Sequence, residues 1–245
     1  MLMLVCLVVV SETTEPECTP SNYEEKLLEK FVRMEFKMEQ TLNRTMQGAI
    51  GTLKEIEARL LMSSTGATYI RWGRSSCPHS NNRLVYHGFA GGTHYSYIGG
   101  GADFQCLPSD PELETVVTNA KFRSSMWGAE YETDGATALS SLNNHEVPCA
   151  VCFTNATTTI MIPARKTCYS GWKLEYYGFL MAERDSLDNN KQYVCVDQNA
   201  EAAPGSSSSN TNGALFNFVF PICKTLKCPP YSSAFALACA VCSKM

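Results

Sequence analysis

Cysteine spacing constrains this sequence more than any other feature. Twelve of its 245 residues are cysteines, and eight of them form two sets in the same order. The first set is Cys77, Cys106, Cys149 and Cys152, and the second is Cys168, Cys195, Cys239 and Cys242. The successive gaps are 29, 43 and 3 residues in the first set and 27, 44 and 3 in the second. Equivalent cysteines of the two sets, such as Cys77 and Cys168, lie 91 residues apart. Because solenoid units span only roughly 20–50 residues, a repeat of this length predicts two tandem copies of one disulfide-stapled module.

The residues around the cysteines repeat as well. The matching segments are RSSC at 74–77 with RKTC at 165–168, VYHGF at 85–89 with EYYGF at 175–179, and CAVC at 149–152 with CAVC at 239–242. In each copy the two closely spaced cysteines can bond to the two earlier ones, for example as Cys77–Cys152 with Cys106–Cys149, and Cys168–Cys242 with Cys195–Cys239. The sequence leaves open the crossed pairing, Cys77–Cys149 with Cys106–Cys152. Cys223 and Cys228 occur only in the second copy, and we expect them to bond to each other.

A Cys-x-x-Cys pair also raises zinc and redox chemistry. A four-cysteine zinc site usually places its second pair about 15–20 residues after the first, whereas here the two pairs end separate copies. A thioredoxin-like pair would open a helix after a strand, but strand-like sequence follows Cys152. We therefore expect structural disulfides and no metal.

The N-terminus indicates secretion. Residues 1–10 are wholly apolar and precede Ser11-Glu12, as in a signal peptide of residues 1–11, although no basic residue precedes the apolar run. A buried N-terminal strand is the alternative. Without Cys6 eleven cysteines remain, and ten of them fall in the duplicated region, which is typical of an oxidising compartment. Sequons at Asn43 and Asn155 agree with an extracellular glycoprotein.

Residues 23–62 lack cysteine and proline and predict a helix. Apolar residues recur at intervals of three and four, which favours an oligomerising coiled-coil stalk with one stutter: Met38, Leu42, Met46, Ala49, Leu53, Ile56 and Leu60. The alternative is one amphipathic helix folded back onto the rest of the chain. Cys18, in the N-terminal segment 12–22, is left unpaired and is an interchain disulfide candidate.

The remainder of the chain predicts a mainly β head over residues 68–245, with halves of about 68–153 and 157–244. Short β-branched and aromatic runs alternate with Gly, Pro, Asn and Ser clusters. Glycines at 91–92 and 99–101 bracket 93–98 as turns would bracket a strand, and 201–213 predicts a flexible loop. The expected fold class is therefore a duplicated, disulfide-rich, mainly β head behind an α-helical stalk.

Several function classes find no support in the sequence. A net charge of −4 with scattered Lys and Arg is unlike a nucleic-acid binder. No apolar run approaches the ~20 residues of a membrane span. The four histidines form no metal or nucleophile motif, and no Gly-x-Ser-x-Gly, P-loop or paired-carboxylate motif occurs. We therefore expect no enzyme, no catalytic residues and no cofactor.

The duplicated region resembles a known family. The segments that carry the resemblance are RWGR at 71–74, Cys77-Pro78, LVYHGFAGG at 84–92, CLP at 106–108, MIPAR at 161–165, CYSGW at 168–172 and CPPY at 228–231. They are similar to the C-terminal non-collagenous domain of sponge short-chain, spongin-type collagens. They are more remotely similar to the tandem non-collagenous domain of type IV collagen, a disulfide-stapled β fold that trimerises and joins collagen networks. The resemblance implies a self-associating, trimeric head.

Two departures limit what the resemblance implies. No Gly-X-Y run precedes the head, so fibre formation need not carry over. Each half of the type IV domain has six cysteines, whereas here the first half has four. The favoured function is a secreted, non-enzymatic structural protein for matrix assembly or adhesion, with other matrix proteins as further partners. The alternative is a multivalent recognition protein that binds glycans or other ligands through aromatic candidates: Tyr95, Tyr97 and Trp127.

Overall fold

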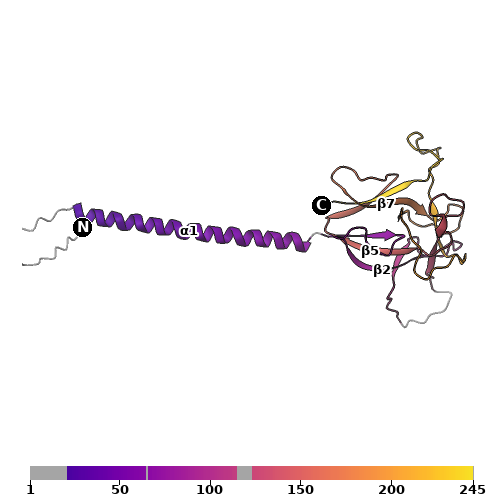
Figure 1. The fold of residues 1–245 in the computed structure, drawn as a ribbon, viewed down its shortest axis with the longest axis horizontal. Helices are drawn as coiled ribbons and strands as arrows, with labels where there is room; N and C mark the ends of the chain where they lie inside the picture. The colour runs from indigo at the N-terminus through magenta and orange to yellow at the C-terminus, as the bar shows by residue number, and fades with distance from the viewer. Residues whose placement is uncertain (1–20, 65, 115–122, 245) are drawn as a thin grey trace, which may run out of the picture. The chain divides into compact units, whose positions relative to one another are not determined.

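The computed structural model describes residues 21–64, 66–114 and 123–244. The chain separates into two compact units, Met1–Ser63 and Ser64–Met245. Strands account for 32% of the structure and helix for 19%, and the helix lies at the N-terminus (Figure 1). The prediction of a mainly β protein with one N-terminal helix is therefore confirmed. No helix within the described ranges is long and apolar enough to cross a membrane.

Helix α1 runs from Ser21 to Ser64 and contains the predicted helical segment. Gly48 and Gly51 lie inside it without interrupting it, although each lowers intrinsic helix stability by about 1 kcal/mol relative to alanine. Every residue from 23 to 58 is exposed, including the apolar stripe that contains Leu42 and Leu53. The apolar side chains of this stripe are therefore exposed on the helix itself.

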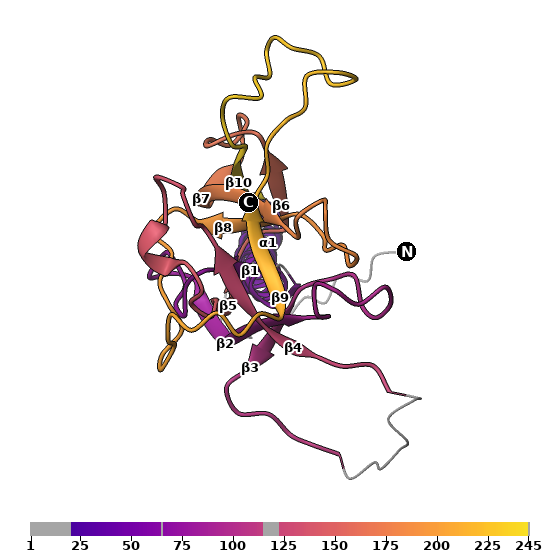
Figure 2. The ribbon, with the colours of Figure 1, turned by 90° about the vertical axis from the view of Figure 1, so that its right-hand side faces the viewer.

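The described residues of the second unit form ten strands and a short 3-10 helix. The strands are β1 (Ala67–Trp72), β2 (Arg83–Gly92), β3 (Gln105–Pro108), β4 (Trp127–Glu132), β5 (Pro148–Thr154), β6 (Thr158–Pro163), β7 (Lys173–Ala182), β8 (Val194–Asp197), β9 (Ala214–Phe218) and β10 (Ala238–Lys244). The 3-10 helix, η2, is Ser140–Leu142. Figure 2 shows the strands crossing at steep angles, with long loops at the periphery.

The strands hydrogen-bond in the order β6-β10-β7-β8-β1-β5-β2-β4-β9, and β3 pairs with β2 beside this path. Two joins are parallel: β4 with β9 along four residue pairs, and β1 with β8 at Trp72 and Val196 alone. Because β9 also pairs with β7, the part of this order that runs β7-β8-β1-β5-β2-β4-β9 closes into a circuit. Strands of the N-terminal half, β1–β5, therefore meet those of the C-terminal half, β6–β10, at two parallel pairings, β1 with β8 and β4 with β9.

The core contains large aromatic side chains and disulfides. The rings of Phe104 and Phe216 stack with centroids 4.0 Å apart, and the Trp72 ring packs against both. The described cysteines form five disulfides: Cys77–Cys152, Cys106–Cys149, Cys168–Cys242, Cys195–Cys239 and Cys223–Cys228. The predicted disulfides are thus confirmed, and the structure adopts the first of the two pairings that the sequence left open.

One local prediction is wrong. Residues 93–98 form a turn rather than a strand, because the Gly91–Gly92 pair continues β2 and the chain reverses immediately afterwards. The Tyr97 amide donates to the His94 carbonyl at 3.0 Å, which closes the turn. The predicted loop 201–213 contains no strand or helix.

Candidate functional site

Three aromatic residues that the sequence offers as ligand candidates lie around one imidazole. The ring centroid of His94 is 4.5 Å from that of Tyr95, which stacks on it, 5.1 Å from Tyr97 and 4.7 Å from Trp127. The Tyr97 and Trp127 rings meet edge to face at 6.2 Å. The structure therefore brings the three candidates together, and His94 occupies the space between them.

Hydrogen bonds fix the orientation of the His94 ring. The Ser96 amide donates to Nδ1 at 3.3 Å, and the Ser96 hydroxyl lies 2.9 Å from the same nitrogen. Because an amide N–H can only donate, Nδ1 accepts and the neutral ring carries its proton on Nε2. The Nε2–H of the neutral His94 ring is therefore a hydrogen-bond donor within the aromatic cluster.

The loop that carries the cluster is anchored by the C-terminal half of the chain. The Asn189 amide donates to the Tyr95 carbonyl at 2.9 Å, and its Nδ2 donates to the carbonyls of Tyr97 and Gly99 at 2.9 and 3.3 Å. Its Oδ1 accepts from the ammonium of Lys191. One buried asparagine therefore holds three backbone carbonyls of the aromatic loop.

A buried ion pair lies behind this asparagine. The Lys191 ammonium is 3.5 Å from Oε2 of Glu183, and both side chains are almost wholly inaccessible. The same oxygen accepts from the Leu215 amide at 3.2 Å. Burial raises the pKa of Glu183 and lowers that of Lys191, and the attraction between the two charges opposes both shifts. The pair costs desolvation energy and fixes the position of Asn189.

The cluster presents only part of its aromatic surface to solvent. Tyr97 is 44% exposed and Trp127 is 37% exposed, whereas Tyr95 and His94 are half-buried. A cavity of about 510 Å³ opens beside Tyr97, between the turn and the exposed Arg123. Its lining is mixed, with Ile98 and the hydroxyls of Ser96 and Ser124. Tyr97 and Trp127 are thus placed to contact a ligand, and Tyr95 supports His94.

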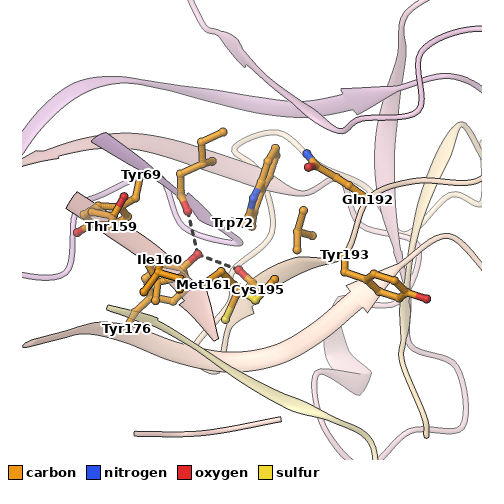
Figure 3. Close-up of a pocket in the computed structure, with 12 residues that line it drawn as sticks. Tyr69, Trp72, Thr159, Ile160, Met161, Tyr176, Gln192, Tyr193 and Cys195 are labelled. Carbon is orange, nitrogen blue, oxygen red and sulfur yellow. Dashed lines mark hydrogen bonds between the residues drawn. The ribbon is translucent and has the colours of Figure 1, made fainter. Parts of the chain in front are cut away.

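A second cavity lies where β1, β6 and β8 diverge (Figure 3). It measures about 230 Å³, and its walls include Tyr69, Ile160 and the exposed Tyr193. The Tyr176 hydroxyl reaches the carbonyl oxygens of Ile70 at 2.8 Å and Cys195 at 2.9 Å, as the dashed lines in Figure 3 mark. Burial raises the pKa of Tyr176, so its hydroxyl remains a donor. The tyrosine thus connects β1 and β8 beyond their single backbone pairing.

Glu175 sits at the same junction between the halves, with its side chain fully buried. Its carboxylate accepts from Asn82 at 2.5 Å and from Ser243 at 2.6 Å, and the Tyr69 hydroxyl lies 3.3 Å away. Burial alone would raise the pKa of Glu175, but hydrogen bonds from Ser243 and Asn82 and the charge of Lys173 outweigh it, so this pKa is lowered. The junction therefore stabilises a buried carboxylate.

The other predicted residues are dispersed. Asn155 is exposed in the turn after β5, and Asn43 is exposed on α1, so both sequons are accessible. Cys18 and the predicted signal peptide lie outside the described residues. Sequence reasoning missed Asn189 and Glu175, whose partners lie up to 106 residues away, and His94, whose contact with Trp127 depends on the pairing of β2 with β4.

Neither the described side chains nor known proteins identify a chemistry. Among the residues that the structure describes, no group of three or more His, Cys, Asp and Glu side chains could hold a metal ion. No protein-family model matches the sequence, and no curated protein matches it.

Proposed function

We propose that the chain is a secreted, non-enzymatic structural protein of the extracellular matrix, whose heads join those of other copies into a trimer. The observation that carries this proposal is a pair of strands, β3 and β6, whose outer edges are unpaired among the described strands. The five disulfides support an oxidising, extracellular location. The resemblance to spongin-type and type IV collagen domains agrees with self-association and with an extracellular location.

The proposal includes a duplicated head, and strand register supports it. In the N-terminal half β3 pairs with β2 so that Gly88 faces Pro108; in the C-terminal half β8 pairs with β7 so that Gly178 faces Asp197. In both halves the glycine holds the same place in the matching segments 85–89 and 175–179, and its partner lies two residues after a cysteine, Cys106 or Cys195. The pairings of β1 with β5 and of β6 with β10 likewise place equivalent residues opposite equivalent cysteines.

A β-bulge also recurs at the matching position of both halves. Between β2 and β5 the pairing skips Val85, and between β7 and β10 it skips Glu175, the residue at the matching position of the segment repeat. Bulges are position-specific features of a fold. A shared bulge supports descent of both halves from one module more strongly than shared cysteines alone.

Within the chain the halves join through the pairing of β4 with β9 and through that of β1 with β8. The counterparts of β1 and β8 in the repeat are β6 and β3. Neither has a second strand partner in the described part of the chain, because β6 ends the strand order and β3 pairs only with β2. We infer that β6 of one copy meets β3 of the next. Such a head-to-tail contact produces a closed ring if its rotation closes.

Side chains at these positions agree with the inference. Tyr69, at the internal junction, is 6% exposed, whereas its counterpart Ile160 on β6 is 46% exposed. Glu175 is buried, whereas its counterpart Val85 is exposed. At both positions a buried side chain with a polar group at the internal junction corresponds to an exposed aliphatic side chain, Ile160 on β6 and Val85 on β2. An exposed apolar edge strand is a surface that proteins normally cover.

The same difference extends to the charged pair at the internal junction. Arg71 and Asp197 are both buried there, and their counterparts in the repeat are Ile162 and Pro108. A proline on an edge strand leaves that edge one donor short. The proposed contact between copies therefore depends on apolar burial more than on a continuous hydrogen-bonded ladder.

Helix α1 supports self-association independently. Its apolar stripe remains exposed from Met38 to Ile56, and its spacing suits packing against copies of itself. A helix of this kind is rarely stable alone in water unless its apolar face is covered. We therefore propose parallel association of the helices of three chains.

The test is the native mass of the secreted protein by light scattering, with and without residues 23–62. The proposal expects a trimer for the full chain, and a head whose assembly survives deletion of the stalk. Ile160→Glu should then weaken head assembly, whereas Ile98→Glu, which alters a more exposed isoleucine away from the β6 edge, should not. A monomer in every form would overturn the proposal.

Recognition of glycans is the second candidate, and the gathering of Tyr95, Tyr97 and Trp127 favours it. Glycan-array binding that disappears in Tyr95→Ala and Tyr97→Ala would support it. Incorporation into insoluble matrix without such binding would favour the structural role alone.

A further inference from the structure

A groove of about 580 Å³ lies between the turn after β6 and the loop that joins β9 to β10. Its lining includes the rings of Tyr169, Tyr231 and Phe235 and the cations of Arg165 and Lys166. Phe235 is 73% exposed, and Tyr169 is also exposed. The groove therefore combines open aromatic surface with positive charge.

The charge of this region is one-sided. Segments 160–172 and 219–238, which contribute the groove, contain four basic residues and neither Asp nor Glu, in a chain whose net charge is −4. The four are Arg165, Lys166, Lys224 and Lys227. Within the described residues none of the four forms a salt bridge. The positive charge is thus available to an anionic ligand.

Arg165 is held in place before any ligand arrives. Its Nε donates to the Thr167 carbonyl and its Nη2 to the Thr167 hydroxyl, each at 3.1 Å. The guanidinium carbon lies 4.3 Å from the centroid of the Tyr169 ring. Since a guanidinium has five N–H donors, the remaining donors can bind a sulfate or carboxylate without further loss of side-chain freedom.

The loop between β9 and β10 is also constrained. The Cys223–Cys228 disulfide closes a short ring that contains Lys224 and Lys227, between the groove-lining Pro221 and Pro230. Figure 2 shows this loop, coloured yellow, projecting from the strands. A ligand that binds a constrained loop loses less ordering entropy than one that binds a flexible loop.

We propose that this groove binds an anionic polysaccharide, with sulfate or uronic-acid groups on the cations and sugar rings against the aromatic side chains. Arg and Lys supply charge-assisted hydrogen bonds to the acidic groups. Aromatic faces suit the apolar faces of pyranose rings better than they suit an acidic peptide, whose charged side chains need no such surface. The site does not depend on the proposed assembly, because all its residues come from one half of one chain.

The experiment measures binding of the full-length secreted protein to a heparin-derived hexasaccharide by calorimetry. Two double variants remove charge, Arg165→Gln with Lys166→Gln and Lys224→Gln with Lys227→Gln. A third variant, Tyr231→Leu with Phe235→Leu, removes rings and keeps charge. Lys26→Gln with Lys30→Gln on α1 is the matched charge control. Circular dichroism and the melting temperature of each variant identify any that misfold.

We expect the first charge variant to weaken binding about tenfold or more. Added salt should weaken binding by the wild type more than binding by the charge variants. The ring variant should also weaken binding, whereas the α1 control should bind as the wild type does. The proposal is wrong if no groove variant weakens binding, or if the control loses as much affinity as they do. If poly-glutamate binds as tightly as the hexasaccharide and the ring variant has no effect, the ligand is an acidic peptide and the polysaccharide proposal is wrong.

Discussion

The guanidinium of Arg71 and the carboxylate of Asp197 join the two halves of the head, with Nε and Nη2 of the arginine each 2.8 Å from Oδ2 of the aspartate. Asp197→Ala leaves a buried cation without its counter-charge, so we expect a loss of about 3–5 kcal/mol in the free energy of unfolding. Urea denaturation measures this loss. Arg74→Gln, which breaks the more exposed pair with Glu201, should cost at most about 1 kcal/mol. Equal losses would contradict this assignment.

Acid should destabilise the head through Glu175. Its pKa in the folded state is lowered from the ordinary value of 4.5, because its hydrogen bonds and Lys173 outweigh the effect of burial. A group whose folded pKa is lowered stabilises the protein above its unfolded pKa, and that contribution is lost as the pH falls through the folded pKa. The pKa of Glu201, which accepts from Ser75, is also lowered and acts in the same direction.

The measurement is the melting temperature between pH 7 and pH 3 for the wild type and Glu175→Gln. We expect the wild type to lose stability below about pH 4.5. The variant should be less stable at neutral pH, and its melting temperature should fall less steeply as the pH is lowered from about 4.5 to 3. If the melting temperature of the variant falls as steeply with acid as that of the wild type, Glu175 does not contribute to the acid sensitivity.

Local patterns in the sequence predicted much of this fold. The apolar spacing of 23–62 indicated the helix, and the cysteine gaps indicated the disulfides, because both signals lie in the order of residue types along the chain. Residues 93–98 defeated the same reasoning. The flanking glycines predicted a strand there, but Asn189, about 90 residues away in the sequence, donates to the carbonyls of Tyr97 and Gly99 and so stabilises a turn.

The site was less predictable than the fold. Tyr95, Tyr97 and Trp127 stood out as aromatics, but their convergence on His94 depends on the meeting of β2 and β4, which no local pattern encodes. The basic groove likewise combines a turn after β6 with a loop some 60 residues later. Tertiary contacts of this kind arise from packing rather than from residue periodicity.

Two glycines should be intolerant of any side chain. A Cβ on Gly178 would lie 1.8 Å from the Val196 carbonyl oxygen, and a Cβ on Gly88 would lie 1.8 Å from that of Leu107. Backbone atoms cannot move aside as a flexible side chain can, so Gly178→Ala should cost about 1–3 kcal/mol or more. Gly128→Ala, where a Cβ would meet nothing within 4 Å, is the control. Thermal unfolding of both variants checks the difference, and similar melting temperatures would refute the clash.

Asn189→Ala should loosen the aromatic loop without unfolding the head. The substitution removes the Nδ2 donor to Tyr97 and Gly99 and the Oδ1 acceptor of Lys191, but leaves the backbone bond to the Tyr95 carbonyl. Loss of an acceptor from a buried ammonium costs about 1–3 kcal/mol. Hydrogen exchange should therefore accelerate at the Tyr97 amide, which bonds within the loop, and remain unchanged in β5 and β10. Uniform acceleration across all strands would mean that Asn189 stabilises the whole head rather than the loop.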